Sequence, residues 1–241
     1  MRRNLFFVIL FLSCIGNCLS QNLSASQIIE EACDYHDFNN ALMTGKYRWH
    51  ILEKRPGQGD NYCILIFDPA NEYYQIKKIY DNESFEYIIE ADNYKIKFNG
   101  STSYSDEIAA KYQLTRKRAY LLRDYYYYLW YMPVKLKDKG TEIDPSASKT
   151  VFNGMECYLI DVSYPLEDDA EIWQFYFDTK QYYLTGYAFQ KAYHSSVAEY
   201  ILLDEEVVHE SLRIPKIRKW YDSSDDQYLG EDILLSLERV P

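Results

Sequence analysis

Apolar and polar residues alternate along residues 45–98. Tyr47, Trp49 and Ile51 occupy every second position of the first segment, and later segments repeat this two-residue period. Such alternation is typical of β-strands with one buried face. Turn-forming residues separate the segments at 56–59, 68–71, 81–83 and 91–93. The pattern therefore predicts an antiparallel meander of about five strands.

Two stretches show helical spacing instead. Residues 24–38 begin with small hydroxyl residues, which predicts a capped amphipathic helix. Its apolar side holds Ile28, Ile29, Ala32, Cys33 and either Tyr35 or His36. Residues 103–132 predict a second helix, because apolar side chains recur at helical spacing after a capping Ser105 and the run stops at Pro133.

The strand pattern resumes after a loop through residues 137–145. Its segments are 150–152, 157–164, 171–178, 182–190, 197–203, 212–221 and 233–240. Both halves together give roughly eleven or twelve strands, more than a flat sheet carries without curling. We therefore expect a mainly β protein with some α-helix (α+β). The predicted architecture is a strongly curved antiparallel sheet or half-open barrel, wrapped around internal helices in a single domain over residues 21–241.

Composition supports this fold class and excludes several functions. The chain has 241 residues, of which 47% are hydrophobic and 17% aromatic, so it is suited to a packed, strand-rich core. Its formal net charge of −11 repels phosphate backbones, and nucleic acid is not an expected partner. The histidines and cysteines lack metal-site spacing, so we expect neither a metal nor a cofactor.

Residues 1–20 are organised like an export signal. Two arginines precede an apolar run from Leu5 to Ile15, and small residues precede a cleavage point after Ser20. This predicts a soluble protein in the periplasm or cell envelope of a Gram-negative bacterium. The alternative is a lipoprotein signal, in which Cys18 is acylated and anchors the protein in the outer membrane. No stretch reaches the roughly 20 apolar residues of a transmembrane helix.

Three cysteines follow the export signal: Cys33, Cys63 and Cys157. An odd and sparse set of thiols is not a disulfide framework. One bridge with a spare thiol and three small buried thiols are both compatible with this pattern.

Two segments carry longer motifs. Residues 124–136 read Asp-Tyr-Tyr-Tyr-Tyr-Leu-Trp-Tyr-Met-Pro-Val-Lys-Leu, and Ile214–Tyr221 reads Ile-Pro-Lys-Ile-Arg-Lys-Trp-Tyr. They resemble the N-Y-Y-x-Y-L-x-G-L-P-M-K-L and I-P-K-x-R-x-W-Y elements of an uncharacterised family of exported bacterial envelope proteins. Asp124 replaces the family's Asn and Tyr131 its Gly, and the bulk of Tyr131 is expected to narrow any pocket beneath the helix end.

The resemblance implies an architecture and a set of candidate residues. The family is similar in predicted architecture to the lipoprotein carriers LolA and LolB, whose half-open barrel holds acyl chains against an internal helix. By this analogy of fold, the candidate ligand contacts are Trp49, Leu121, Tyr125, Tyr128, Leu129, Met132, Trp173, Phe175 and Phe177. The basic residues Lys216 and Arg218 are candidates for contact with an anionic headgroup at the barrel mouth.

These features predict a monomeric, non-enzymatic protein that binds a hydrophobic small molecule or lipid in its concave face. The ligand class is an acyl chain, a lipid or the anchor of an envelope lipoprotein. The alternatives are a glycan-binding or structural envelope module, in which exposed aromatic rings stack on sugars, and a hydrolase. Only His36 beside Asp37 and His50 suggest acid–base chemistry, and no nucleophile motif accompanies them, so no catalytic residue is predicted.

Overall fold

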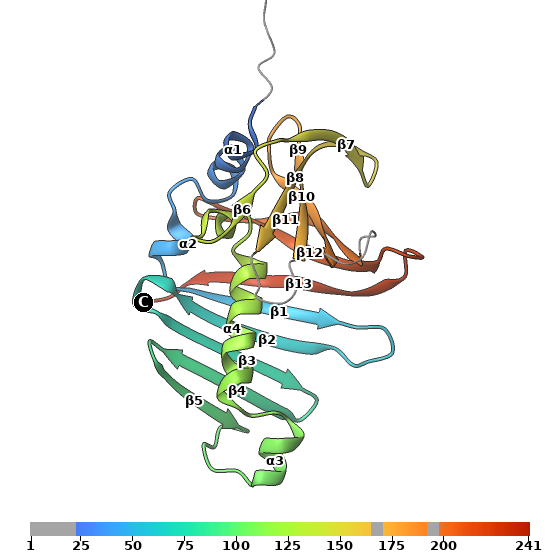
Figure 1. Cartoon of the computed structure of the whole chain (residues 1–241). Helices are drawn as coiled ribbons and strands as arrows, with labels where there is room; N and C mark the ends of the chain where they lie inside the picture. Colours follow the sequence, from blue (N-terminus) through green and yellow to red (C-terminus); the bar gives the residue numbers. More distant parts are fainter. Residues whose placement is uncertain (1–22, 165–170, 192–197) are drawn as a thin grey trace, which may run out of the picture.

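The computed structural model describes residues 23–164, 171–191 and 198–241. Across these residues the chain forms one twisted antiparallel sheet with helices packed against it (Figure 1). Residues 1–22, which hold the predicted export signal and Cys18, lie outside the described residues.

The first half of the chain is the five-strand meander that the alternation predicts. Its strands are β1 (Tyr47–Lys54), β2 (Asn61–Asp68), β3 (Tyr73–Tyr80), β4 (Glu83–Glu90) and β5 (Asn93–Phe98). The short 3₁₀ helix η1 (Pro69–Asn71) forms the connection between β2 and β3. Each predicted turn segment lies at a strand junction, so this part of the fold is confirmed.

The second half supplies the remaining strands. They are β6 (Glu142–Ile143), β7 (Ser148–Phe152), β8 (Met155–Tyr164), β9 (Glu171–Asp178), β10 (Leu184–Lys191), β11 (Glu199–His209), β12 (Leu212–Asp222) and β13 (Tyr228–Arg239). Strand β6 has only two residues, and no alternation reveals so short a strand. The sheet of the described residues therefore has thirteen strands, against eleven or twelve predicted.

The first and last strands join the two halves. The strand order is β5-β4-β3-β2-β1-β13-β12-β11-β10-β9-β8-β6, and β7 pairs with β8. Strand β1 pairs antiparallel with β13, from Tyr47 opposite Arg239 to Lys54 opposite Glu231. The path ends at β5 on one side and β6 on the other, so the sheet is open. This confirms the predicted half-open antiparallel architecture.

Helix α1 (Ala25–Asp37) begins where the sequence predicts. The Ser24 side chain accepts a hydrogen bond from the Gln27 backbone, and the Gln27 side chain accepts one from the Ser24 backbone, a complete capping box. Its buried face packs near β12 and the 3₁₀ helix η2 (Val134–Lys137). The short helix α2 (Ala41–Thr44) follows, and the Asp37 carboxylate accepts hydrogen bonds from the Ala41 and Leu42 amides at its start.

The prediction of one helix over residues 103–132 is wrong in one respect, because this stretch forms two helices. These are α3 (Asp106–Lys111), capped by Ser105 as expected, and α4 (Arg116–Trp130). Gln113 between them has a φ of 53°, a left-handed conformation that a helix interior does not allow. The Thr115 side chain then accepts a hydrogen bond from the Arg118 amide and starts a new helix.

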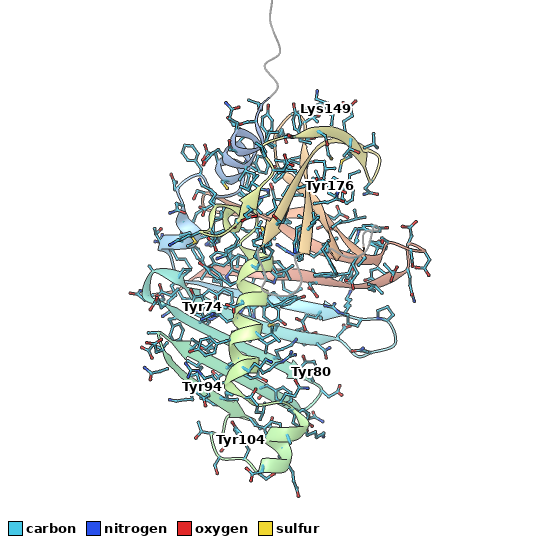
Figure 2. The ribbon with its side chains drawn as sticks, viewed as in Figure 1. Tyr74, Tyr80, Tyr94, Tyr104, Lys149 and Tyr176 are labelled. Atoms are coloured by element: carbon cyan, nitrogen blue, oxygen red, sulfur yellow. The ribbon has the colours of Figure 1, made fainter. Side chains whose placement is uncertain are left out.

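Helix α4 is the internal helix around which the sheet is arranged. It crosses the first meander (Figure 1) and contacts β3, β4 and β5. Tyr74, Tyr80 and Tyr94 of this meander lie beside it (Figure 2), and the ring centroids of Tyr74 and Tyr127 are 5.3 Å apart. The helix is therefore held by aromatic side chains along its length.

The core at the end of α4 is built from large aromatic residues. Trp49, Trp130 and Tyr131 are fully buried. The Trp49 ring centroid lies 5.8 Å from that of Trp130 and 5.7 Å from that of Tyr131. Tyr131 thus occupies the core at the end of α4. That it narrows a ligand pocket there stays a prediction.

Cys33, Cys63 and Cys157 are buried, free thiols. Burial raises the pKa of the Cys33 thiol to about 12. Of the two alternatives left by the sequence, the structure shows the small buried thiols.

The helices of the described residues are too short or too polar to cross a bilayer.

Candidate functional site

An apolar pocket of about 650 Å³ lies between α4 and the second half of the sheet. Helix α4 forms one wall, and strands β8, β9, β10 and β12 form the other. The pocket is lined by Leu121, Asp124, Tyr125, Tyr128, Leu129, Tyr164, Trp173, Tyr187, Phe189 and Trp220. Nine of these ten side chains are aliphatic or aromatic, and Asp124 alone carries a charge.

Five of the predicted contact residues meet in this pocket. Helix α4 contributes Leu121, Tyr125, Tyr128 and Leu129, and β9 contributes Trp173. Leu121 and Tyr125 are unusually exposed for their types, at 54% and 41%. Ligand binding by these residues remains a prediction, but the fold brings them to one place.

The other four predicted contacts lie in the core and not in the pocket wall. They are Trp49, Met132, Phe175 and Phe177, all at most 3% exposed. Phe175 lies opposite Ile160 and Phe177 opposite Tyr158 in the β8–β9 ladder, and all four side chains belong to the packed core or contact it. Alternation identifies the inner face of a strand, but only tertiary packing separates a filled position from an open one.

Four aromatic residues of the wall were not among the candidates: Tyr187, Phe189, Trp220 and Tyr164. Tyr187 and Phe189 alternate along β10, Trp220 lies on β12, and Tyr164 ends β8. Their ring positions depend on strand pairing, since Phe189 lies opposite Trp173 across the β9–β10 ladder with ring centroids 5.3 Å apart. Alternation along β10 was the only signal for the first two.

The aromatic side chains of the pocket wall also contact one another. The Tyr128 hydroxyl is hydrogen-bonded to the Tyr164 hydroxyl across the helix–sheet boundary. The Tyr128 and Trp173 centroids are 5.8 Å apart in an edge-on arrangement. Burial is the main reason that the pKa of Tyr128 is far above its ordinary value, so this residue stays a neutral hydroxyl.

The two basic candidates occupy different environments. Arg218 is 1% exposed, its guanidinium lies 3.6 Å from the Trp130 ring centroid, and its Nη1 donates to the Pro215 carbonyl at 2.9 Å. It therefore cannot meet a headgroup at the surface, and in this respect the prediction for Arg218 is wrong. Lys216 is partly exposed, but it forms an ion pair with Glu205.

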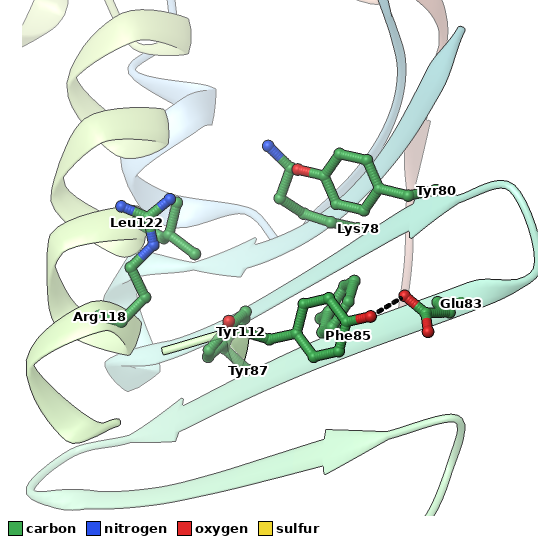
Figure 3. A pocket seen from close by; sticks show the side chains of 8 residues that line it. All are labelled: Lys78, Tyr80, Glu83, Phe85, Tyr87, Tyr112, Arg118 and Leu122. Carbon is green, nitrogen blue, oxygen red and sulfur yellow. Dashed lines mark hydrogen bonds between the residues drawn. The ribbon is translucent and has the colours of Figure 1, made fainter. Parts of the chain in front are cut away.

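A second, more polar groove continues along α4 from the apolar pocket. Its central part, about 530 Å³, shares Leu121 and Tyr125 with the apolar pocket and includes Arg55, Lys78 and Arg118. A further recess of about 270 Å³ is drawn in Figure 3, where Arg118 extends from α4 and Lys78 from β3 on facing sides. The recess also holds Glu83, which accepts a hydrogen bond from the Tyr112 hydroxyl.

Two buried acids neutralise two of the cations in this groove. The Lys78 ammonium lies 3.0 Å from a Glu53 carboxylate oxygen, and the other Glu53 oxygen accepts a hydrogen bond from Tyr126. The Arg55 guanidinium lies 2.8 Å from Asp232, which is 1% exposed. Such buried pairs fix local geometry because an unpaired buried charge is costly.

The histidine and acid considered for catalysis have structural roles. The Nε2 of His36 accepts a hydrogen bond from the Leu184 amide at 3.0 Å, so Nδ1 carries the proton and donates to the Arg213 carbonyl at 2.6 Å. Burial lowers the pKa of His36 to about 4. Asp37 caps α2, as described above. Across the described parts of the chain, no three His, Cys, Asp or Glu side chains gather into a metal-binding group.

Comparison with known proteins gives a family and a fold. A family model described as a family of unknown function, DUF6503, matches residues 4–236. No curated protein sequence matches the chain.

Two solved structures are similar in fold. One is a LolA superfamily protein from Nitrosomonas europaea, with a TM-score of 0.51 and 7% identity over 91% of this chain and 95% of that one. The other is a domain from Vibrio parahaemolyticus assigned to the outer membrane lipoprotein-sorting proteins, with a TM-score of 0.50 and 7% identity over 88% of this chain and 91% of that one. At this identity the similarity establishes the fold alone.

Proposed function

The chain belongs to the DUF6503 family of unknown function, and we propose that it is a non-enzymatic envelope protein that binds a hydrophobic ligand. The ligand is an acyl chain, carried by a lipid or by a lipoprotein anchor. It occupies the apolar pocket between α4 and strands β8, β9, β10 and β12.

The observation that carries this proposal is the composition of the pocket wall. Apolar pockets of several hundred Å³ with few polar groups are typical sites for hydrophobic ligands. Here Leu121 and Tyr125 line the pocket with 54% and 41% of their surface exposed, and a ligand that covers them would remove apolar surface from water. Burial of apolar surface is the free-energy source that such binding requires.

The fold supports the proposal as an analogy. One structure of similar fold is assigned to lipoprotein sorting, and that role is transferred here only as a hypothesis. Residues 1–20 agree with it, because their pattern predicts export to the envelope, where such ligands occur. Acylation at Cys18 would place the same pocket at the membrane surface.

A glycan-binding role fits the wall less well. Sugars need several hydrogen-bonding side chains beside the stacking rings. In this pocket the Tyr128 and Tyr164 hydroxyls are hydrogen-bonded to each other, and Asp124 is the one charged side chain. Binding of soluble oligosaccharides in place of apolar probes would reverse this preference.

The test is a pocket-blocking substitution with a matched control. Leu121→Arg places a charge at the pocket mouth. Leu235→Arg makes the same change on β13 at a residue that is 51% exposed and lies outside the pocket. Binding of the apolar fluorophore N-phenyl-1-naphthylamine is titrated, and the melting temperature checks folding.

We expect Leu121→Arg to weaken binding of the fluorophore at least tenfold, with Leu235→Arg close to the wild type. Mass spectrometry of organic extracts from the purified protein should show a co-purifying lipid that Leu121→Arg loses. If the wild type binds no apolar probe, or if Leu121→Arg binds it unchanged, the proposed site is wrong.

A further inference from the structure

The apolar pocket, the central polar part and the recess adjoin along α4, and together we call them the α4 groove. The polarity of its lining changes from one end to the other. Leu121, Tyr125 and Leu129 face the apolar pocket, while Arg118 faces the polar recess. The two regions adjoin, since Leu121 and Tyr125 line both the apolar pocket and the central part of the groove. The spacing of these residues places them along one side of the helix. The groove is therefore a single amphipathic channel, apolar at one end and cationic at the other.

Arg118 supplies the uncompensated charge of this groove. Arg55 and Lys78 are neutralised by Asp232 and Glu53. The Arg118 guanidinium has neither an ion pair nor a hydrogen bond among the described residues, and it is only partly exposed. Its charge opposes the burial that raises the pKa of the Tyr87 hydroxyl, so the guanidinium acts on the interior of the recess.

The charge of Arg118 is opposite in sign to that of the whole chain. Of the three cations that line the central part, Arg55 and Lys78 are paired with acids and Arg118 is not, whereas the chain carries a formal net charge of −11. A local cation in an acidic protein selects for an anionic group through charge complementarity. A guanidinium also presents several N–H donors in a plane, which suits the oxygens of a phosphate.

The distance between the two ends fits a lipid. Arg118 and Leu129 are eleven residues apart on one helix, which corresponds to about 16 Å along its axis. The hydrocarbon core of a bilayer is about 30 Å thick, so the chains of one leaflet extend about 15 Å. A chain in the apolar pocket therefore has its headgroup near Arg118.

We propose that the α4 groove binds an anionic phospholipid, with its acyl chain in the apolar pocket and its phosphate on Arg118. This inference rests on the proposed function and specifies its ligand. Glu83, the acid of the recess, accepts a hydrogen bond from Tyr112 (Figure 3) and forms no ion pair with Arg118, so the guanidinium can meet a headgroup.

The experiment compares two lysophospholipids with the same acyl chain. Lysophosphatidylglycerol is anionic and lysophosphatidylcholine is zwitterionic, and both are titrated as monomers into the full chain by calorimetry. Arg118→Gln removes the proposed contact. Lys117→Gln is the control, because it removes the same charge from the adjacent residue of α4, which does not line the groove.

We expect the wild type to bind the anionic lipid about tenfold more tightly than the zwitterionic one. Arg118→Gln should abolish this preference and leave the affinity for the zwitterionic lipid unchanged, whereas Lys117→Gln should keep the preference. Higher salt should also reduce it.

Three results would overturn the inference. Equal binding of both lipids by the wild type would contradict the anionic headgroup and leave the proposed function intact. Binding of neither lipid would contradict both. Displacement of the anionic lipid by an equal concentration of inorganic phosphate would show a site for small anions and not for an amphiphile.

Discussion

His36 connects α1 to two strands of the sheet through both nitrogens of its ring. Its Nδ1–H group donates a hydrogen bond to the Arg213 carbonyl on β12, and its Nε2 accepts a hydrogen bond from the Leu184 amide on β10. A proton on Nε2 would break the second bond and place a charge where water does not reach. The fold therefore excludes the protonated ring, and this dictates how stability responds to pH.

The His36 environment predicts a loss of stability in mild acid. Its pKa is about 4 in the folded chain against an ordinary 6.5, so below pH 6.5 the unfolded chain binds a proton that the folded chain does not. Stability is fully present above pH 6.5 and decreases as the pH falls towards 4, by on the order of 3 kcal/mol from this group. Urea unfolding at a series of pH values measures the decrease.

His36→Gln should lose this part of the pH dependence while retaining the rest. His50→Gln serves as the control, because His50 lies on the half-buried side of β1 and not in the core. An unchanged slope in His36→Gln would show that another group titrates in this range.

At the scale of elements, α4 depends on a cap in the middle of an apparently continuous helical pattern. Gln113 turns the chain out of α3, and the Thr115 hydroxyl accepts a hydrogen bond from the Arg118 amide in the first turn of α4. Leu129, proposed to contact the acyl chain, and Arg118, proposed to contact the headgroup, both lie on this helix. Its starting point therefore determines where the groove residues are placed.

Thr115→Ala should destabilise the protein by about 1 kcal/mol, because it leaves an amide at the start of α4 without its acceptor. Thr102→Ala is the control, since Thr102 is exposed in a loop and caps no helix; there we expect a change within about 0.5 kcal/mol. Urea denaturation of both variants measures the difference. Equal effects would mean that the cap contributes nothing specific.

At the scale of the whole molecule, the pairing of β1 with β13 makes one sheet from two meanders. This pairing joins strands from opposite ends of the chain. The side chains of Tyr47, Trp49 and Ile51 on β1 are buried in the core. The edge strands β5 and β6 have one neighbour each in the strand order. Stability should therefore be highest in the middle of the sheet and lowest at its edges.

Hydrogen exchange followed by mass spectrometry tests this distribution. Peptides from β1 and β13 should exchange last, at rates set by global unfolding, and peptides from β5 should exchange much earlier through local opening. Faster exchange in β1 than in β5 would mean that the two meanders separate before the sheet edge opens.

Much of this architecture follows from the sequence alone. The two-residue period around Tyr47, Trp49 and Ile51 identifies a strand because a pleated backbone sends neighbouring side chains to opposite faces. Ser24 identifies the start of α1 because its side chain can satisfy an amide at the helix end. Such signals are local, and they predicted the strands and helices along the chain. The number of strands then predicted a curved, half-open sheet.

Only the tertiary structure decided which of the predicted residues line a pocket. Trp49 and Trp173 both belong to apolar strand faces, yet one is buried in the core and the other lies in a pocket wall. Arg218 belongs to a basic run, yet it lies under the ring of Trp130. The reason is that alternation reports which face of a strand is turned inward, whereas open space and charge compensation depend on strand register and on which helix covers each position.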